Sequence, residues 1–166
     1  MPEVFRVAEL GKGYLGVMAR PGVDAPLHEV FGALAQLDVR VVVSLLEESE
    51  VRELGLADEK AACETAGLEF LSFPIKDRGL PCDAQAVSEF SKWAHTRITQ
   101  GSGLVFHCRA GIGRSGMMAA SVLLHAGFTV REAFARISAA RGMIVPDAPG
   151  QLEWVESHCE TIMGST

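Results

Sequence analysis

The chain has 166 residues, a formal net charge of −6, 48% hydrophobic residues and 22% charged residues. This length and composition predict a single globular domain over residues 1–166, large enough to bury a substantial core. The negative charge argues against nucleic acid and against an anionic membrane as general partners. The uncharged stretch at 115–130 is too short and too mixed to span a bilayer, and the N-terminus lacks the pattern of a secretory signal.

The cysteines favour a reducing compartment. Cys63, Cys82, Cys108 and Cys159 form no C-x-x-C pair and have no regular spacing. Free thiols in the cytoplasm are therefore expected rather than a disulfide framework. The five histidines are scattered along the chain, so we predict no metal site and no cofactor.

The first half of the chain alternates between strand and helix patterns. The first elements are two short strands around a Gly-Lys-Gly turn within 3–22 and a helix within 26–38 capped by Asp24. A strand covered on both faces follows at 39–46, and then a helix from about 49 to 66 that ends at Gly67. The last is a strand at 68–75 that runs into the loop 76–83.

The second half is mostly helical. Asp83 begins a helix that extends to about 100, and a short buried strand follows at 103–108. The helix at 113–125 is apolar almost all round, which is typical of a helix in the middle of a fold. Thr129 caps a further helix, and Pro149 precedes the last one, at 151–163. The order of elements predicts an α/β fold: a single domain with a central, mostly parallel sheet of about five strands and helices on both faces.

The segment HCRAGIGRSG, at 107–116, contains the candidate catalytic and ligand-binding residues. Gly111, Gly113 and Gly116 fit the G-x-G-x-x-G pattern of a dinucleotide-binding loop. That pattern normally belongs to the first strand–helix–strand unit and is followed by an acidic residue at the end of the next strand. Here the next segment is helical, and a dinucleotide site gives no use to Cys108 or Arg114.

An anion-binding cradle around a nucleophilic thiolate uses every residue of this segment. Cys108 and Arg114 frame five residues, Arg109, Ala110, Gly111, Ile112 and Gly113, and Ser115 follows at once. A short loop over a helix N-terminus can aim successive backbone N–H groups at one tetrahedral oxyanion. The guanidinium of Arg114 offers a planar fork for two further oxygens. Beside that guanidinium, Cys108 is expected to be a thiolate near neutral pH.

With these residues in view, HCRAGIGRS resembles the H-C-x5-R-[ST] signature of the cysteine-dependent protein phosphatases. FPIKDRGLP, at 73–81, resembles the mobile loop that carries the general acid of that family. Over about 30–156 the chain is most similar to the small dual-specificity group, in particular the kinase-associated phosphatase type. The resemblance implies a tyrosine-phosphatase-like fold and hydrolysis of phosphate monoesters without a metal.

The resemblance also implies roles for individual residues. Cys108 attacks phosphorus and forms a cysteinyl-phosphate, and Arg114 with the backbone of 109–114 binds the phosphate. Asp77 is the candidate general acid, with Asp83 as its rival on position along the chain. Ser115 is a further catalytic residue, whose hydroxyl donates to the departing thiolate. Two supporting roles follow: His107 orients the loop, and Gln151 helps to place the hydrolytic water.

Several alternatives stay open at this level. Arg78 and Arg109 either meet an anionic substrate or serve solubility, and Cys82 is the best candidate for a disulfide with oxidised Cys108. A phosphorylated protein or peptide is the expected substrate, on tyrosine, serine or threonine. A phosphoinositide is disfavoured by Ile112, since lipid-preferring relatives often carry a basic residue there. A catalytically weak phosphate-binding module is the second hypothesis, and the sequence leaves oligomeric state undetermined.

Overall fold

The computed structural model describes residues 2–164. Its sheet has the strand order β1-β2-β5-β3-β4. The four strands β2, β5, β3 and β4 run parallel, and only the edge strand β1 is antiparallel to its neighbour. The strands are β1 (Phe5–Leu10), β2 (Gly13–Met18), β3 (Val39–Ser44), β4 (Glu69–Ser72) and β5 (Gly103–His107). The prediction of one mostly parallel five-stranded sheet is confirmed.

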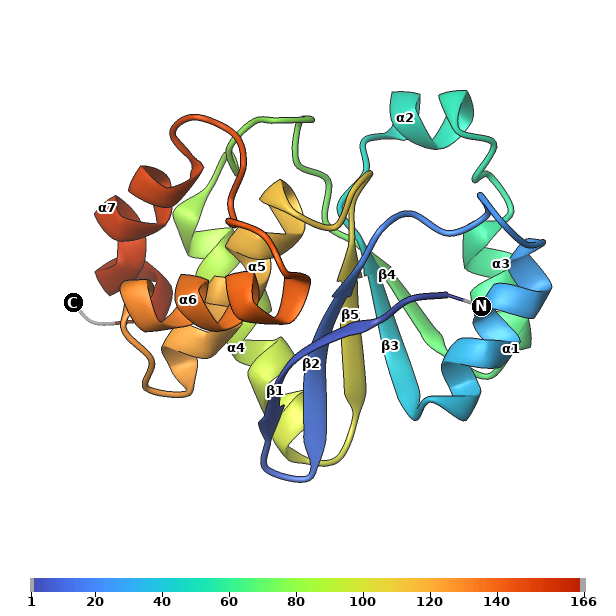
Figure 1. The fold of residues 1–166 in the computed structure, drawn as a ribbon, viewed down its shortest axis with the longest axis horizontal. Helices are drawn as coiled ribbons and strands as arrows, with labels where there is room; N and C mark the ends of the chain where they lie inside the picture. Colours follow the sequence, from blue (N-terminus) through green and yellow to red (C-terminus); the bar gives the residue numbers. More distant parts are fainter. Residues whose placement is uncertain (1, 165–166) are drawn as a thin grey trace.

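Helices cover both faces of this sheet (Figure 1). On one face lie α1 (Leu27–Gln36) and α3 (Glu59–Thr65), and on the other lie α4 (Ala84–Thr99), α5 (Gly113–His125), α6 (Val130–Arg141) and α7 (Gln151–Met163). The short helix α2 (Glu48–Glu53) follows β3, at the top of the view in Figure 1. Because the carboxyl ends of parallel strands meet at one edge of a sheet, the loops after β3, β4 and β5 converge there.

The larger core lies between the sheet and α4 to α7. Helix α5 runs through its middle, and every residue of α5 from Arg114 to Leu124 is buried. Burial of one Leu or Met side chain contributes about 1.5–3 kcal/mol, so α5 is the best-anchored helix of this layer. The helix that carries Arg114 and Ser115 is thereby a rigid platform for the loop before it.

Three boundaries differ from the sequence predictions. The predicted helix at 49–66 is two helices, α2 and α3, because the chain breaks at Gly55, whose φ is +69°. Asp24 does not cap α1, which begins after Pro26 with no side-chain cap. Strand β4 ends at Ser72 rather than residue 75, so the acid loop begins earlier than predicted. By contrast, Thr129 caps α6 as predicted, in a capping box with Glu132.

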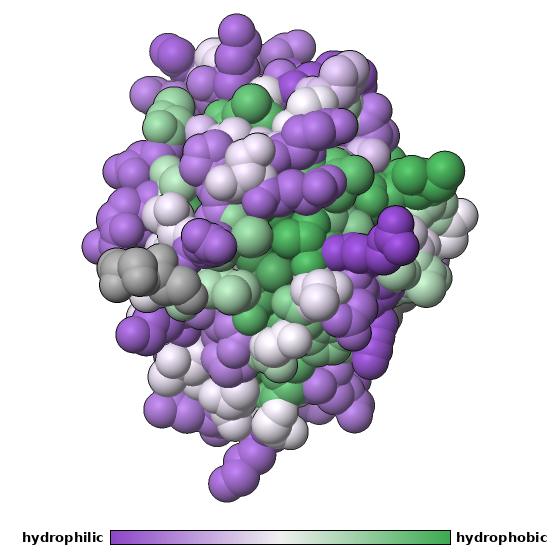
Figure 2. Space-filling view, turned by 90° about the vertical axis from the view of Figure 1, so that its left-hand side faces the viewer, coloured by the Kyte–Doolittle hydropathy of each residue, from purple (hydrophilic) through white to green (hydrophobic). Residues whose placement is uncertain are grey.

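The outer surface on the α7 side is mixed in polarity. Figure 2 shows hydrophobic residues gathered in the middle of this face with hydrophilic residues around them. Across the whole described surface, the exposed large hydrophobic side chains are Val23, Leu80, Met143, Ile144 and Met163. Met143 and Ile144 are neighbours in the chain, and the other three are separated along it; exposed apolar side chains are ordinary on protein surfaces. Within residues 2–164, no helix combines the length and the apolar character needed to cross a membrane.

Candidate active site

The thiol of Cys108 lies at the end of β5, in the loop 108–112 that leads into α5. Cys108 follows the last residue of β5, and its side chain is 3% exposed. The hydroxyl of Ser115, in the first turn of α5, donates to Cys108 Sγ at 3.1 Å. A cavity of about 180 Å³ opens over this thiol, and it is lined by Asp77, Arg78, Cys108, Arg109, Ala110, Gly113, Arg114, Asp147 and Gln151. The structure therefore brings the predicted nucleophile, acid and arginine to one cavity.

The backbone of the cradle is oriented by bonds on its outer side. The carbonyl of Arg109 accepts from the backbone N–H of Arg20 at 3.1 Å. Arg141, at the end of α6, donates to the carbonyls of Ala110 and Gly111, both at 3.0 Å. In a planar trans peptide the N–H points opposite to the C=O. The N–H groups of the same three peptides, at residues 110–112, therefore point toward the cavity side, as an oxyanion cradle requires.

Gly111 is the position in the cradle where no side chain fits. Its φ is +71°, and a Cβ there would lie 2.5 Å from the backbone carbon and oxygen of Met18. The loop therefore packs directly on the end of β2. This close approach fixes the cradle against the sheet.

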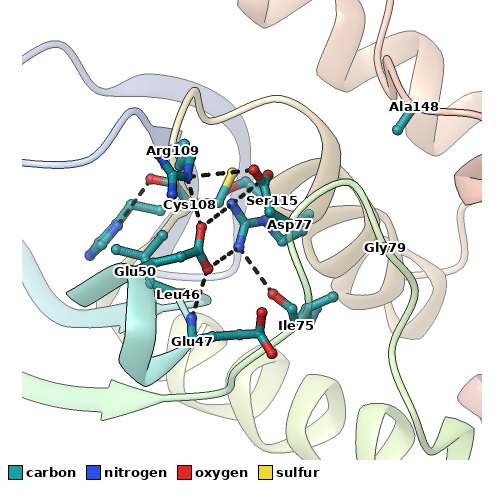
Figure 3. Close-up of polar contacts among 12 residues, drawn as sticks. Leu46, Glu47, Glu50, Ile75, Asp77, Gly79, Cys108, Arg109, Ser115 and Ala148 are labelled. Carbon is teal, nitrogen blue, oxygen red and sulfur yellow. Dashed lines mark hydrogen bonds and ion pairs between the residues drawn. The ribbon is translucent and has the colours of Figure 1, made fainter. Parts of the chain in front are cut away.

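The guanidinium of Arg114 donates to two carboxylates and a carbonyl, and Figure 3 shows these partners, Glu50, Asp77 and Ile75, gathered near Cys108. Its Nη1 donates to Glu50 Oε2 at 2.8 Å and to the carbonyl of Ile75 at 3.0 Å. Its Nη2 donates to Glu50 Oε1 at 3.1 Å and to Asp77 Oδ1 at 2.9 Å. Each of these nitrogens carries two protons, so all four terminal N–H bonds have partners. Arg114 is 2% exposed, and its position is set by α2 and the acid loop together.

Glu50 is the shared partner of two arginines. Arg109 Nε donates to Glu50 Oε1 at 2.9 Å, and Arg109 Nη2 donates to Glu53 at 3.0 Å. Burial alone would raise the pKa of Glu50, but the hydrogen bonds from Arg114, from the backbone of Glu47 and from Arg109 outweigh it, and the pKa is lowered. Glu50 is therefore an anion at neutral pH that holds both basic side chains of the C-x5-R loop.

The structure separates the two aspartates that competed for the acid role. Asp77 lines the cavity and is about half exposed, with Oδ2 lying 3.5 Å from Arg109 Nε. Asp83 caps α4 and accepts from the backbone N–H of Gln85 at 2.9 Å. Arg78, the neighbour of Asp77, has a positive φ of 57° and also lines the cavity. Position in the cavity therefore favours Asp77, and Asp83 has a structural role.

Gln151 connects the acid loop to the first turn of α7. It is 1% exposed, and its amide donates to the carbonyl of Gly79 at 3.2 Å. The amide oxygen accepts from the backbone N–H of Ala148 at 3.4 Å. A Cβ on Gly113 would lie within 3.0 Å of the Gln151 amide. Gln151 therefore reaches the cradle itself, where the predicted role in placing water requires it.

His107 lies under the cradle rather than in the cavity. Its side chain is fully buried, with Nδ1 lying 3.4 Å from the carbonyl oxygen of Cys108. Its Nε2 lies 2.5 Å from a carboxylate oxygen of Glu59, on α3. His107 is therefore outside the cavity lining, and its role in orienting the loop stays a prediction.

Four residues of the site had no signal in the sequence motif: Glu50, Glu59, Arg141 and Asp147. Glu50 and Glu59 both follow β3, whose carboxyl end lies beside that of β5. The one signal in the sequence for these two carboxylates was that acidic residues follow β3, the strand beside β5. Arg141 sits in the last turn of a surface helix, where a basic residue is commonplace, so no pattern singled it out.

All four cysteines are free thiols in the structure. Cys82 is exposed and Cys63 is buried. Burial, with the charges of Glu59 and Glu64, raises the pKa of Cys63 to about 12. Cys63 is therefore a neutral packing residue, whereas pairing of Cys82 with an oxidised Cys108 stays a prediction.

Cys108 directly follows β5 and Arg114 lies in the first turn of α5, and with the five-stranded sheet they place the chain in the cysteine-dependent phosphatase superfamily, small dual-specificity type. A protein-family model described as the DSP-PTPase phosphatase of polymorphic toxin systems (Tc-R-P) matches residues 16–128, about two thirds of the chain. The chain belongs to this family.

Individual relatives agree with this assignment. The tyrosine-protein phosphatase CDC14 of Saccharomyces cerevisiae is 29% identical over 149 residues, which are 89% of this chain and 25% of that protein. The chain thus spans about a quarter of the length of that relative. Kinase associated phosphatase, solved with serine in place of its catalytic cysteine, superposes with a TM-score of 0.86 at 17% identity over 100% of this chain and 97% of that one. PTPMT1 superposes at 0.77 and 24% identity, over 98% and 97% of the two chains. At these identities the two structures show a shared fold.

Proposed function

We propose that this protein hydrolyses phosphate monoesters through a cysteinyl-phosphate intermediate on Cys108. One observation carries the proposal: Cys108 Sγ lies 3.1 Å from Ser115 Oγ under a cavity that Arg114 and Asp77 also line. A phosphate reading module would need the arginine and the backbone cradle but has no use for the thiol and the carboxylic acid.

In the first step the phosphate group enters the cradle and takes hydrogen bonds from the backbone N–H groups and from Arg114. Nη2 of Arg114 becomes available when Asp77 leaves it, since the other terminal N–H bonds hold Glu50 and Ile75. The thiolate of Cys108 attacks phosphorus, the S–P bond forms and the P–O bond to the leaving group breaks. A protonated Asp77 gives its proton to the departing oxygen.

In the second step water attacks the phosphorus of the cysteinyl-phosphate. Asp77, now a carboxylate, accepts a proton from this water, and inorganic phosphate forms as the S–P bond breaks. Ser115 Oγ is within hydrogen-bond distance of the departing sulfur and stabilises it as a thiolate. Gln151, held between the acid loop and the cradle, orients the water.

We propose a phosphorylated protein or peptide as the substrate, on tyrosine, serine or threonine, in a reducing cytoplasm. The name of the CDC14 relative, a tyrosine-protein phosphatase, supports a protein substrate. The mouth of the cavity mixes Arg78 and Arg109 with Asp77 and Asp147. Mixed charge fits a polypeptide better than a strongly anionic membrane surface, which favours clusters of like-charged cations.

A phosphoinositide is the second candidate, because PTPMT1, a structural neighbour, has been solved in complex with PI(5)P. Against it, Ile112 stands at the position of the cradle, the N-cap of α5, where lipid-preferring relatives often carry a basic residue, and its side chain packs against the core.

The test is hydrolysis of para-nitrophenyl phosphate against pH in the presence of EDTA. Wild-type protein should be active, Cys108→Ser inactive, and Asp77→Asn weaker with loss of the decline at alkaline pH. Asp83→Asn is the matched control and should retain activity. A panel of phosphopeptides and PI(5)P then separates the two substrate classes. Folded wild-type protein without activity on any of them would overturn the proposal.

A further inference from the structure

The side chain of Arg109 has no part in the proposed reaction, although it lines the cavity directly after the nucleophile. A basic side chain at this place has two explanations. It either contacts an anionic group of the substrate or serves a contact within the protein. The partners of its guanidinium distinguish the two.

Three carboxylates surround the guanidinium of Arg109 (Figure 3). Its Nε donates to Glu50 Oε1 at 2.9 Å, and its Nη2 donates to Glu53 Oε2 at 3.0 Å. Oδ2 of Asp77 lies 3.5 Å from the same Nε. The hydrogen bonds to Glu50 and Glu53 raise the pKa of Arg109, so the side chain stays a cation. Its charge is already offset by carboxylates, and an anionic group of the substrate would have to compete with them.

Arg109 is fixed at both of its ends. The backbone carbonyl of Arg109 accepts from the N–H of Arg20 at 3.1 Å. At the head of the side chain, Glu50 is 4% exposed and also accepts from the backbone N–H of Glu47 at 2.9 Å. The guanidinium is therefore held against α2, whereas Asp77 belongs to the acid loop and is about half exposed. Arg109 thus connects a fixed helix to the loop that carries the acid.

This connection becomes important when phosphate binds. In the free protein Asp77 has two attachments, from Oδ1 to Nη2 of Arg114 and from Oδ2 to Arg109. A phosphate group that takes Nη2 of Arg114 removes the first attachment. The second does not depend on Nη2 of Arg114, because Glu50 and Glu53 hold Arg109 in place.

We propose that Arg109 is a positioning residue that keeps Asp77 over the cavity after phosphate has taken Arg114. The inference rests on the proposed function, since it assigns Arg109 to the acid of that reaction. It extends the role of the C-x5-R loop from binding phosphate to holding the acid loop closed.

The geometry of the contact is compatible with a protonated acid. Nε carries one proton and gives it to Glu50. Oδ2 of Asp77 is therefore held by charge, without receiving that N–H, and has room for its own proton. A guanidinium has five N–H bonds, and Arg109 uses two of them within residues 2–164. The remaining N–H bonds supply donors for the second oxygen of a protonated Asp77.

The dependence of the rate on the leaving group tests this role. Arg109→Gln should lower kcat on phenyl phosphate roughly tenfold, because a misplaced acid fails a poor leaving group. On para-nitrophenyl phosphate, whose leaving group departs readily, the loss should stay under about twofold with little change in KM. Arg52→Gln, at an exposed arginine of α2, is the matched control. Equal losses on both substrates, or a rise in KM alone, would indicate direct contact with phosphate and overturn the proposal.

Two further variants separate positioning from general loosening of the fold. In an Asp77→Asn background, Arg109→Gln should cause no further loss on phenyl phosphate, because Arg109 acts through Asp77. Glu53 is 65% exposed, so Glu53→Gln leaves the fold intact while it removes one anchor of Arg109. It should show the same dependence on the leaving group with a smaller loss. An added loss in the Asp77→Asn background would contradict the proposal.

Hydrogen exchange of the acid loop tests the proposal without turnover. Peptides that cover 76–82 are followed by mass spectrometry in wild type and Arg109→Gln, with and without inorganic phosphate. Exchange there should be at least about threefold faster in Arg109→Gln when phosphate is present, with unchanged exchange in α5. Equal exchange in the two proteins under both conditions would overturn the proposal. The proposed hydrolysis is judged separately by Cys108→Ser, so failure of the one is distinguishable from failure of the other.

Discussion

Nη2 of Arg114 donates to Asp77 Oδ1 at 2.9 Å, so the residue proposed to bind phosphate holds the residue proposed to act as acid. Nη2 has no N–H left for a phosphate oxygen while it donates to both Glu50 and Asp77. Entry of a phosphate group therefore changes both residues at once. The anion takes the place of the carboxylate, and the acid loop is released for proton transfer.

The first prediction follows from this competition. Asp77→Asn should bind inorganic phosphate about twofold to fivefold more tightly than wild type, because an ion pair with a half-exposed partner is worth about 0.5–1 kcal/mol. The same variant should turn over substrate more slowly, because the acid is lost. Titration calorimetry with phosphate measures the first effect, and Asp83→Asn is the control that should match wild type. Weaker phosphate binding by Asp77→Asn would show that the two groups do not compete.

The second prediction concerns Glu50, which is 4% exposed. Glu50→Gln removes the charge that both Arg109 and Arg114 face, and breaking a buried ion pair costs about 3–5 kcal/mol. We expect a loss of stability near the low end of that range, since the amide oxygen still accepts one bond. Urea unfolding measures this loss of stability. The matched control is Glu48→Gln, which alters an exposed residue of the same helix. Equal stability of the two variants would contradict the account.

The same residue predicts a pH dependence. The pKa of Glu50 is lowered in the folded protein, so its contribution to stability is full above its unfolded value of about 4.3 and is lost as pH falls through the lowered folded value. The free energy of unfolding should therefore fall less steeply with acid in Glu50→Gln than in wild type. Unfolding curves between about pH 5 and pH 2 test this, and parallel acid limbs would be the contrary result.

The third prediction separates backbone strain from steric conflict in the cradle. Gly111 and Gly127 both have positive φ, +71° and +93°, but only Gly111 has atoms close to the place of a Cβ. Gly127→Ala should cost about 1 kcal/mol and keep full activity. Gly111→Ala should cost about 2–4 kcal/mol, because the methyl group meets the backbone of Met18. It should also lose most activity, as the N–H groups of the cradle move. Thermal melts measure the loss of stability in the two variants, and steady-state rates measure their loss of activity.

The fourth prediction lies far from the active site. Burial, with the charges of His95 and Lys92, lowers the pKa of His125, whose Nε2 lies 3.0 Å from Ser91 Oγ. A base with a lowered folded pKa contributes stability that is present above its unfolded value of about 6.5 and is lost as pH falls below it. The midpoint of thermal unfolding should therefore fall between about pH 6.5 and pH 5 in wild type and fall less in His125→Gln. His28→Gln, at an exposed histidine, should behave as wild type.

Much of the site could be predicted because its chemistry is local in the chain. Cys108, Arg114 and Ser115 lie within eight residues of one another, and the strand and helix around them have strong hydrophobic patterns. The cradle follows from that short stretch alone. Asp77 was predicted from the resemblance of its loop, and the structure places it in the same cavity.

The carboxylates behind the cradle could not be predicted in the same way. Glu50 and Glu59 reach Arg114 and His107 across 64 and 48 residues, through contacts that depend on how β3 lies against β5. Their segment had a continuous helical pattern, and the break at Gly55 that separates the two glutamates was missed. A glycine within a helical pattern is only a weak signal of a break, so the sequence placed both residues on one ordinary helix.

The measurement that tests the central claim most directly is trapping of the covalent intermediate. Wild-type protein and Gln151→Ala, in which hydrolysis of the intermediate should be slowed, are mixed with para-nitrophenyl phosphate, quenched with acid and digested. Mass spectrometry should then find one phosphoryl group on the peptide that contains Cys108, with more of it in Gln151→Ala than in wild type and none in Cys108→Ser. Turnover of substrate without phosphate on Cys108, or turnover that persists in Cys108→Ser, would contradict the account.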